Sequence, residues 1–466
     1  MTEVQKLAYF VSSRSYNDLS NEAVRELKIR LLDSLGCAIG ALKGKPIKML
    51  KEQLDDFGGN PLISLIGGGK TAPDRAAFYN SALVRYLDFN DSYLAKNETC
   101  HPSDNIGSVL SAGQYSDRSG KDFLTALAIA YQVQCRLSDV APVRDKGYDH
   151  TVQGAYGTAA GAAFALGLDA QKTANAIAIS ATAYNALRVT RTGNLSNWKG
   201  LAFPSTGWTS THSAFLAMRG ITGPEEVFEG NKGFKETISG NFEIEWENEN
   251  LEKVNQTIIK KFNAEIHSQA TLEGIQELIL LYKFDPRDIV SIVLNTFDVA
   301  FNIIGGGEEG EKKNISTKEE ADHSLPYMMA GLLLDGNVLP AQYLPERILQ
   351  KDVQDLLQKV QVNQKKEYSD RFPNEMPCHI SITLKDGTVL EIEKKDYQGF
   401  LTRPASWEMI VEKFNNLAAP FADEFLREEI ITMVEELENY QISDLMALLE
   451  KVGTTTSTQN LKLSNI

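Results

Sequence analysis

The stretch His379-Ile-Ser-Ile-Thr-Leu-Lys-Asp-Gly-Thr-Val-Leu-Glu-Ile-Glu393 alternates apolar and polar side chains on both sides of Asp386-Gly387. Alternation with a period of two predicts strands with one buried face, and an Asp-Gly pair between two such strands predicts a hairpin. The segment Ile289-Val-Ser-Ile-Val-Leu-Asn-Thr296 is β-branched and predicts a further strand. Two helical stretches, residues 318–334 and 345–359, lie between these strands. We therefore expect residues 264–400 to form an α/β insert.

The sequence on both sides of this insert has the apolar spacing of helices. Residues 24–42 and 123–137 carry apolar side chains three and four positions apart. Between residues 154 and 168, small side chains fall on one helical stripe, which would let two helix backbones approach closely. Helical character returns after Ser406, which can cap a helix, and again over residues 425–452.

The length and composition fit a globular protein of two domains. A chain of 466 residues is too long for one ordinary core, and its hydrophobic content of 42% is typical of folded proteins. We predict a mainly α fold with an α/β insert. An all-helical domain is built from both chain ends, residues 1–263 and 401–466, and residues 264–400 form a smaller α/β lid domain. The last dozen residues are expected to be frayed.

The charge and the chain start restrict the partners and the location. A net charge of −15 argues against nucleic acid, because phosphate binding needs a basic face. A small anion could still bind a local basic pocket, since screening limits the field of the whole molecule to about 8 Å. The start Met-Thr-Glu-Val-Gln-Lys does not resemble a signal peptide, and no apolar run is long enough for a membrane span. We therefore expect a cytoplasmic protein with no membrane partner.

Signatures of metal and nicotinamide sites are missing from the sequence. The four cysteines form no Cys-x-x-Cys pair, which argues against a zinc ribbon or a usual iron–sulfur site. No His-Glu-x-x-His motif is present, and no Gly-x-Gly-x-x-Gly follows a strand. We therefore expect no cofactor and no metal.

Two glycine-rich segments only partly resemble phosphate-binding loops. Gly67-Gly-Gly-Lys-Thr71 matches the end of such a loop, but the glycine needed five positions before Gly69 is Ser64. Gly305-Gly-Gly307 precedes the acidic run Glu308-Glu-Gly-Glu, which would repel phosphate. We expect the second segment to be a flexible loop.

Reactive side chains are concentrated in Tyr86-Leu-Asp-Phe-Asn-Asp-Ser-Tyr93 and Cys100-His-Pro-Ser-Asp-Asn105. These segments supply three carboxylates, a histidine, hydroxyls and an amide. Two further histidines, His150 and His267, also lie in polar breaks between apolar segments, as His101 does. Loops at helix ends are where a scaffold presents catalytic groups. For each histidine taken singly, a structural or surface role is the competing interpretation.

A lysine and a tyrosine extend this set. Asn197-Trp-Lys-Gly200 places Lys199 where it could pair with a substrate carboxylate, or donate a proton if it is partly desolvated. An ordinary solvated lysine is the alternative. Asp322-His-Ser-Leu-Pro-Tyr327 opens an apolar helix and offers a phenol near the lid. The residues thus indicate a metal-free pocket suited to proton transfer on a carboxylate substrate, without choosing that substrate.

Taken together and in order, the motifs resemble those of the MmgE/PrpD family, whose members include 2-methylcitrate dehydratase. The similar segments run over nearly the whole chain: Leu32-Asp-Ser-Leu-Gly-Cys, Leu87-Asp-Phe-Asn-Asp, His101-Pro-Ser-Asp-Asn, Trp198-Lys-Gly, Ile221-Thr-Gly-Pro-Glu-Glu with Phe228-Glu-Gly, Ala264-Glu-Ile-His-Ser-Gln, and Asp322-His-Ser-Leu-Pro-Tyr with Leu334-Asp-Gly. The resemblance implies a cofactor-independent homodimer with a cleft between a helical domain and an α/β lid.

The resemblance also implies a reaction on a small carboxylate. Members of the family dehydrate 2-methylcitrate, decarboxylate cis-aconitate or epimerise iminodisuccinate. We expect a hydro-lyase acting on 2-methylcitrate, and on citrate as a related tricarboxylate. The alternatives are a cis-aconitate decarboxylase, an epimerase of a small dicarboxylate, and a non-catalytic tricarboxylate-binding relative.

The family motifs also assign the site residues. They make Asp88, His101, His150, Lys199, His267 and Tyr327 the acid–base candidates, with Ser92, Lys199 and His267 at the substrate. We expect His101, supported by Asp88, to remove a proton next to a carboxylate. A protonated Lys199, His150 or Tyr327 would then assist the loss of the hydroxyl.

Overall fold

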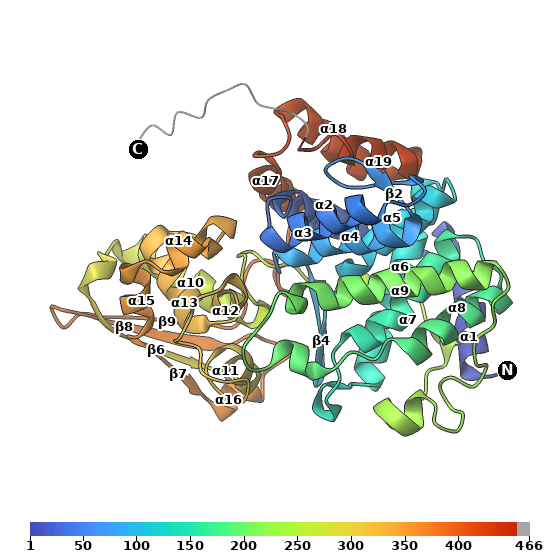
Figure 1. The fold of residues 1–466 in the computed structure, drawn as a ribbon. Helices are drawn as coiled ribbons and strands as arrows, with labels where there is room; N and C mark the ends of the chain where they lie inside the picture. The colour runs from blue at the N-terminus through green and yellow to red at the C-terminus, as the bar shows by residue number, and fades with distance from the viewer. Residues whose placement is uncertain (454–466) are drawn as a thin grey trace.

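The computed structural model describes residues 1–453, and the fraying expected for the last dozen residues lies outside that range. Its buried hydrophobic side chains form two large clusters. One takes members from residues 4–259 and 405–452, and the other from residues 258–400. Both ends of the chain therefore share one core, while the insert has a core of its own. Figure 1 shows the two parts side by side, with the C-terminal helices packed over the N-terminal ones.

The helical domain confirms the expected helix-rich character. Its α-helices are α1 Glu3–Ser12, α2 Asn21–Gly40, α3 Lys45–Phe57, α4 Pro73–Tyr86, α5 Ile106–Tyr115, α6 Gly120–Val140, α7 Thr151–Ala165, α8 Ala170–Ala183, α9 Trp198–Met218, α17 Trp407–Ala418, α18 Glu424–Glu435 and α19 Ile442–Leu449. The predicted cap is present, since the Ser406 side chain accepts a hydrogen bond from the backbone of Met409. None of the helices in residues 1–453 has both the length and the apolar character needed to cross a bilayer.

The small-residue stripe of α7 allows the close packing that the sequence predicts. A Cβ atom on Gly157 would lie 2.8 Å from the carbonyl oxygen of Ala130 on α6, and one on Gly161 would lie 3.0 Å from that of Ala126. On another side, a Cβ on Gly154 would overlap the ring of Phe203 on α9. Helix α7 is thus wedged between α6 and α9, and His150 stands at its N-terminus.

The insert is built on a four-stranded sheet in the order β7-β6-β8-β9. The strands are β6 Ile289–Thr296, β7 Val360–Gln364, β8 Cys378–Leu384 and β9 Val389–Lys394. Strands β6 and β7 are parallel, whereas β8 is antiparallel to both β6 and β9. The predicted hairpin is confirmed, with Ile382 opposite Leu390 and Gly387 at a φ of 87° in its turn. The α-helices of the insert are α10 Gln269–Tyr282, α11 Asp298–Ile304, α12 Lys318–Ala321, α13 Leu325–Asp335, α14 Pro345–Ile348, α15 Lys351–Leu357 and α16 Lys366–Ser369.

Both helical stretches expected in the insert are interrupted. Residues 345–359 divide into α14 and α15, and residues 318–334 divide into α12 and α13. The second break has a clear cause, because the Ser324 side chain caps the backbone N–H of Tyr327 and Pro326 occupies the first turn of α13. Asp322 and His323 lie in this break and are buried.

Two small sheets were not predicted. Strands β1 Ile63–Ser64 and β2 Lys70–Thr71 form a pair that encloses the glycine-rich segment at residues 67–69. Strands β3 Ser92–Ala95, β4 Glu98–Cys100 and β5 Thr257–Ile258 form a sheet in the order β4-β3-β5. The second sheet ties the reactive segments around residues 88–105 to the chain that leads into the insert.

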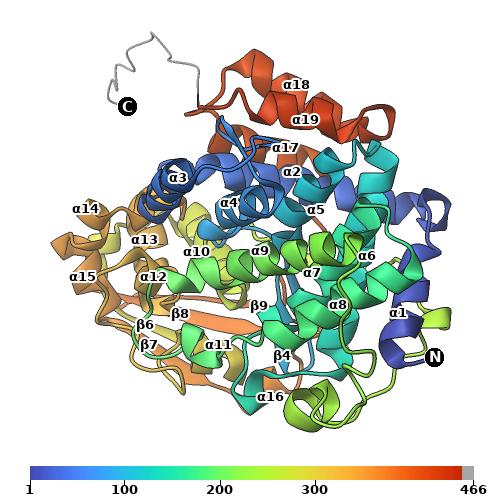
Figure 2. The ribbon, with the colours of Figure 1, turned by 45° about the vertical axis from the view of Figure 1, so that its right-hand side comes forward.

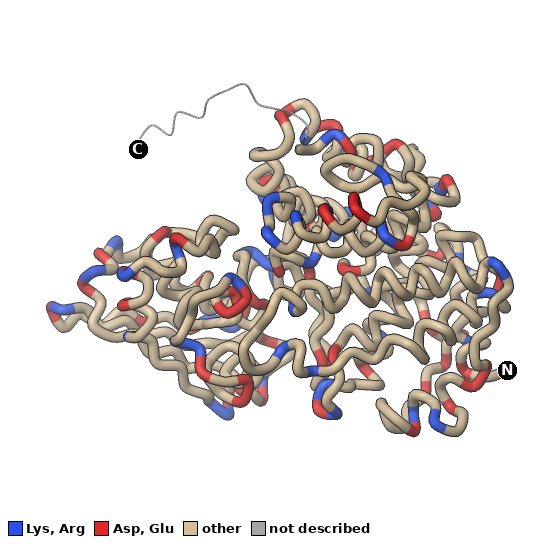
Figure 3. Tube along the Cα trace, in the orientation of Figure 1, with Lys and Arg blue, Asp and Glu red and all other residues tan. Residues whose placement is uncertain are grey.

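In Figure 2 the insert sits against one end of the helical bundle. Figure 3 shows that both basic and acidic residues occur along the chain where the two parts meet.

Candidate active site

A small polar cavity lies between the helical domain and the insert. The helical domain lines it with Arg85, Asp88, Glu98, Thr99, His101, Arg144, His150, Arg188, Arg191 and Lys260, and the insert with Glu265, His267, Ile303, Glu309 and His323. Of the predicted residues, Asp88, His101, His150 and His267 are therefore brought together. Ser92, Lys199 and Tyr327 lie outside the lining.

His101 is held in one tautomer. Its Nδ1 lies 2.7 Å from the backbone oxygen of Asp91 and 3.0 Å from the Ser92 hydroxyl. Because a carbonyl oxygen only accepts hydrogen bonds, Nδ1 carries the proton and Nε2 keeps its lone pair. Burial, together with the cations of Arg85 and Lys260, holds the pKa of His101 well below its ordinary value. The ring is thus neutral and can accept a proton at Nε2.

Within residues 1–453 no hydrogen bond or ion pair joins Asp88 to His101, so the expected support by Asp88 is limited to the effect of its charge on the ring. Its carboxylate lies 2.6 Å from Arg85, 2.7 Å from Lys260 and 3.3 Å from Lys199. Burial alone would raise the pKa of Asp88, but these cations hold it well below its ordinary value. Its φ of 56° is in the left-handed region, which is costly for a residue with a Cβ. Asp88 thus acts as an anion that anchors three cations at the cavity wall.

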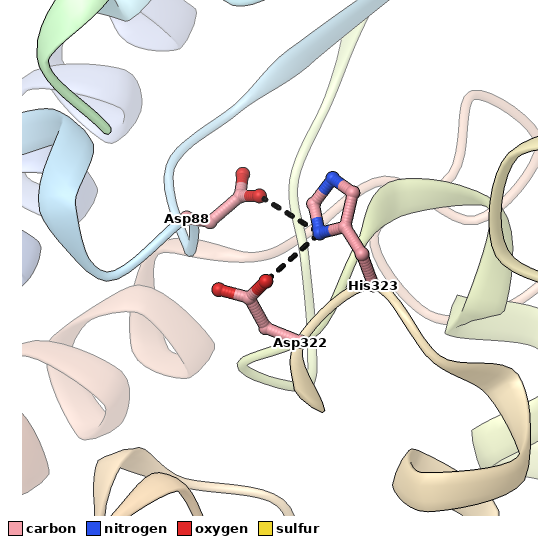
Figure 4. A group of neighbouring side chains, drawn as sticks. All are labelled: Asp88, Asp322 and His323. Carbon is pink, nitrogen blue, oxygen red and sulfur yellow. Dashed lines mark hydrogen bonds and ion pairs between the residues drawn. The ribbon is translucent and has the colours of Figure 1, made fainter. Parts of the chain in front are cut away.

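Lys199 contacts Asp88 but does not itself line the cavity. Its Nζ lies 2.8 Å from Asp322, 2.7 Å from Nδ1 of His323 and 3.3 Å from Asp88. Burial lowers the pKa of the Lys199 ammonium, and the two aspartates oppose this effect. Asp88, Asp322 and His323 point toward one another in Figure 4, and their atoms lie close enough to ligate a metal ion. The Lys199 ammonium already contacts all three, so the cluster has a cation from its own chain.

His150 is held neutral beside His101. Its Nε2 accepts a hydrogen bond from Arg191 at 3.1 Å, which places the ring proton on Nδ1. Burial lowers the pKa of His150 to about 3, because the charge of Asp149 does not compensate for burial and Arg191. Nδ1 is buried and has no hydrogen-bond partner in residues 1–453. A ligand oxygen would satisfy that donor.

His267 approaches the cavity from the insert. Its Nδ1 lies 2.7 Å from the Glu265 carboxylate, and its Nε2 is buried without a hydrogen-bond partner among the described residues. Burial opposes ionisation of Glu265, yet the neighbouring His267 holds the pKa of that carboxyl at about 2. A carboxylate bonded to one ring nitrogen orients an imidazole for proton transfer at the other. This geometry leaves Nε2 of His267 available for proton exchange with a ligand in the cavity.

Tyr327 is placed away from this chemistry. Its hydroxyl donates to the backbone oxygen of Gln342, and its ring packs near Tyr343 within the insert. Burial raises its pKa. In this arrangement the side chain stabilises α13 and does not face the cavity.

The chain matches the models of the MmgE/PrpD N-terminal domain over residues 5–247 and of the MmgE/PrpD C-terminal domain over residues 262–439. It belongs to the MmgE/PrpD family. Cis-aconitate decarboxylase of Mus musculus is 26% identical over 99% of this chain and 96% of its own length. The mitochondrial 2-methylcitrate dehydratase of Yarrowia lipolytica is 27% identical over 96% and 90%, and the 2-methylcitrate dehydratase of Escherichia coli is 26% identical over 84% and 85%. The cis-aconitate decarboxylase and the two 2-methylcitrate dehydratases thus have about the same sequence identity to this chain.

In this MmgE/PrpD protein the Arg and Lys side chains that line the cavity are not predicted from the sequence. Five Arg and Lys side chains line the cavity against four carboxylates, although the whole chain carries a net charge of −15. Arg188 and Arg191 lie in a polar break between α8 and α9, the same signal that identified the histidines. His323 lies in the break between α12 and α13, where the apolar spacing of the sequence continues without interruption. The cavity can therefore attract an anionic ligand locally.

Proposed function

We propose that this protein is a cofactor-independent hydro-lyase that dehydrates 2-methylcitrate to 2-methylaconitate, with citrate as a second substrate. The observation that carries the proposal is His101, a neutral histidine whose Nε2 is open to a cavity rich in cations. A base beside cationic side chains suits removal of a proton from a carbon next to a carboxylate. The MmgE/PrpD membership and the relatives named 2-methylcitrate dehydratase support this choice.

In the proposed reaction, His101 Nε2 takes the proton from the carbon beside a substrate carboxylate. The electron pair of that bond forms the new carbon–carbon double bond. The neighbouring hydroxyl leaves as water after it receives a proton from Nε2 of His267, whose ring must carry a proton on both nitrogens for this step because Nδ1 donates to Glu265. Lys260 and Arg85 stabilise the negative charge that develops on the carboxylate, and His150 donates its Nδ1 proton in a hydrogen bond to a substrate oxygen. Lys199 acts indirectly by holding Asp88 and Asp322.

Decarboxylation of cis-aconitate is the second candidate, because a relative of that name aligns with 99% of this chain. The same cavity would then supply a proton to the carbon that loses carbon dioxide. The test is to incubate the protein with 2-methylcitrate, citrate and cis-aconitate and to identify products by mass spectrometry. We expect a product lighter by one water from 2-methylcitrate. Release of carbon dioxide from cis-aconitate would favour the second candidate, and saturable binding without turnover would contradict both.

We also propose that the protein is a homodimer. Large apolar side chains are exposed beside site residues: Leu187 and Val189 flank Arg188, and Trp198 precedes Lys199. Exposed apolar groups concentrated near a functional site are typical of interaction surfaces.

A further inference from the structure

Glu309 connects the insert to the helical domain across the cavity. It lies in the loop after α11, in the acidic run that follows the three glycines at residues 305–307. Its carboxylate is 2.6 Å from the Arg188 guanidinium and 3.2 Å from that of Arg144, and the side chain is almost fully buried. A carboxylate from one part of the molecule is thus held by two arginines from the other.

The two arginines share one ion-pair partner in the described part of the chain, although the charges of Asp149 and Glu98 also act on Arg188. Within residues 1–453, Arg144 and Arg188 form ion pairs with Glu309 alone. By contrast, Arg85 pairs with Asp88 and Arg191 with Asp149, and these aspartates belong to the helical domain itself. Charge-assisted bonds between guanidinium and carboxylate groups are strong and geometrically specific. Arg144 and Arg188 therefore form the part of the cavity that is best suited to bind another carboxylate, provided that Glu309 moves away.

Glu309 stands between the cavity and the surface. Among the described residues it alone lines both the inner cavity and an outer pocket, whose other lining residues are 193–195, 310–312, 314–316 and 320. Gly306 and Gly310, on either side of it, have φ values of 102° and 99°, and a Cβ at either position would meet open space. Lys312 lines the outer pocket and forms no ion pair within residues 1–453, although its charge already interacts with that of Glu309. The loop can thus turn Glu309 outward, where a cation is available to it.

We propose that Arg144 and Arg188 form a carboxylate-binding subsite, and that Glu309 occupies this subsite until a carboxylate of the substrate replaces it. The inference rests on the proposed function for the class of ligand, a small tricarboxylate. Glu309 then competes with the substrate for the two arginines. It excludes ligands that lack a carboxylate able to displace it.

Because Glu309 competes with the substrate, replacing Glu309 and replacing Arg188 should have opposite effects on citrate binding. Glu309→Gln removes the competing charge, so citrate should bind about tenfold more tightly than to the unmodified protein. Arg188→Gln removes half of the subsite, so citrate should bind about tenfold more weakly or worse. A purely structural ion pair would behave differently, because either change would break it and both would act in the same direction.

The experiment is a calorimetric titration of each variant with citrate, with thermal unfolding as a check of folding. Arg188→Lys serves if Arg188→Gln does not fold, and should also weaken binding because lysine loses the forked geometry. Glu319→Ala is the matched control: its carboxylate accepts a hydrogen bond from Asn197 at 3.0 Å across the same boundary, and it lines neither the inner cavity nor the outer pocket. This control should bind citrate as the unmodified protein does.

Effects in the same direction for Glu309→Gln and Arg188→Gln, or no effect of either, would overturn the subsite, as would a failure of the unmodified protein to bind citrate. Failure of the proposed function is a separate outcome. If citrate binding shifts in opposite directions but no product forms from 2-methylcitrate, the subsite stands and the hydro-lyase assignment falls. If 2-methylcitrate is dehydrated but neither variant changes citrate binding, the hydro-lyase assignment stands and the subsite falls.

Discussion

The hydrogen bond from His101 Nδ1 to the Asp91 carbonyl decides what this side chain can do. It fixes the tautomer, keeps Nε2 unprotonated and orients the ring in the cavity. Asp88, which is closer to the cations than to His101, controls the electrostatics of the wall instead. The proposed base and the anion Asp88 are thus separate residues with separate partners.

Replacing His101 by alanine removes the proposed base without removing a major part of the core. We expect the turnover number with 2-methylcitrate to fall by about a hundredfold or more, with the fold retained by circular dichroism. His212→Ala is the control, because its side chain is 53% exposed, pairs with Asp74 and does not line the cavity. Near-normal turnover in His101→Ala would remove this residue from the mechanism.

The lowered pKa of His101 predicts the pH dependence of the reaction. An ordinary histidine would be half protonated at a pH near its usual pKa of 6.5 and would lose its function as a base below it. Since burial and nearby cations shift this pKa downward, the unprotonated form persists into acid, and His150, with a pKa of about 3, behaves likewise. We therefore expect kcat/KM not to fall as the pH is lowered from about 8 to 6.5. A loss of kcat/KM with a midpoint near 6.5 would show that His101 titrates normally, provided that citrate binding is constant over the same range.

Among the elements, α7 and the break between α12 and α13 position the site. The wedging of α7 between α6 and α9 fixes His150, and the small-residue stripe made this packing predictable from sequence. The break was not predictable from apolar periodicity, because the spacing continues through residues 318–334. Ser324, which caps α13, and Pro326 in its first turn are the features of the sequence that indicate a helix start at this point. Strands β3 to β5 escaped prediction since each is too short to show alternation.

Two glycine substitutions test the packing of these elements. Gly157→Ala would place a methyl 2.8 Å from a backbone oxygen of α6, so the free energy of unfolding should fall by about 1–3 kcal/mol. Gly331→Ala lies in α13 with open space around its Cβ, so higher helix propensity should raise that free energy by up to about 1 kcal/mol. Urea unfolding measures both. Equal effects of the two substitutions would contradict the close approach of α7 to α6.

At the scale of the whole molecule, the cavity exists only where two cores meet. His101 and His150 come from the helical domain and His267 from the insert, so the proposed base and acid are assembled by the packing of the two parts. The sequence indicated the helical ends, the insert and most of the histidines. It did not indicate that the Tyr327 hydroxyl bonds to Gln342, or that arginines in the polar break face inward. The orientations of Tyr327 and of these arginines depend on contacts between segments that are far apart in the sequence.

The proposed homodimer is tested by light scattering after size-exclusion chromatography. We expect a mass about twice the chain mass of 51.6 kDa, because the apolar side chains beside Arg188 and Lys199 would otherwise face water. The single-chain mass over a range of concentrations would contradict the dimer.

The most direct test of the central claim is the product formed from 2-methylcitrate by protein from which metals have been removed with a chelator. Because His101, His267 and the cations of the cavity are proposed to carry the reaction, we expect mass spectrometry to find the dehydrated tricarboxylate, formed at the rate of the untreated protein. Unchanged 2-methylcitrate, or a product that forms only after a metal ion is added back, would contradict the account.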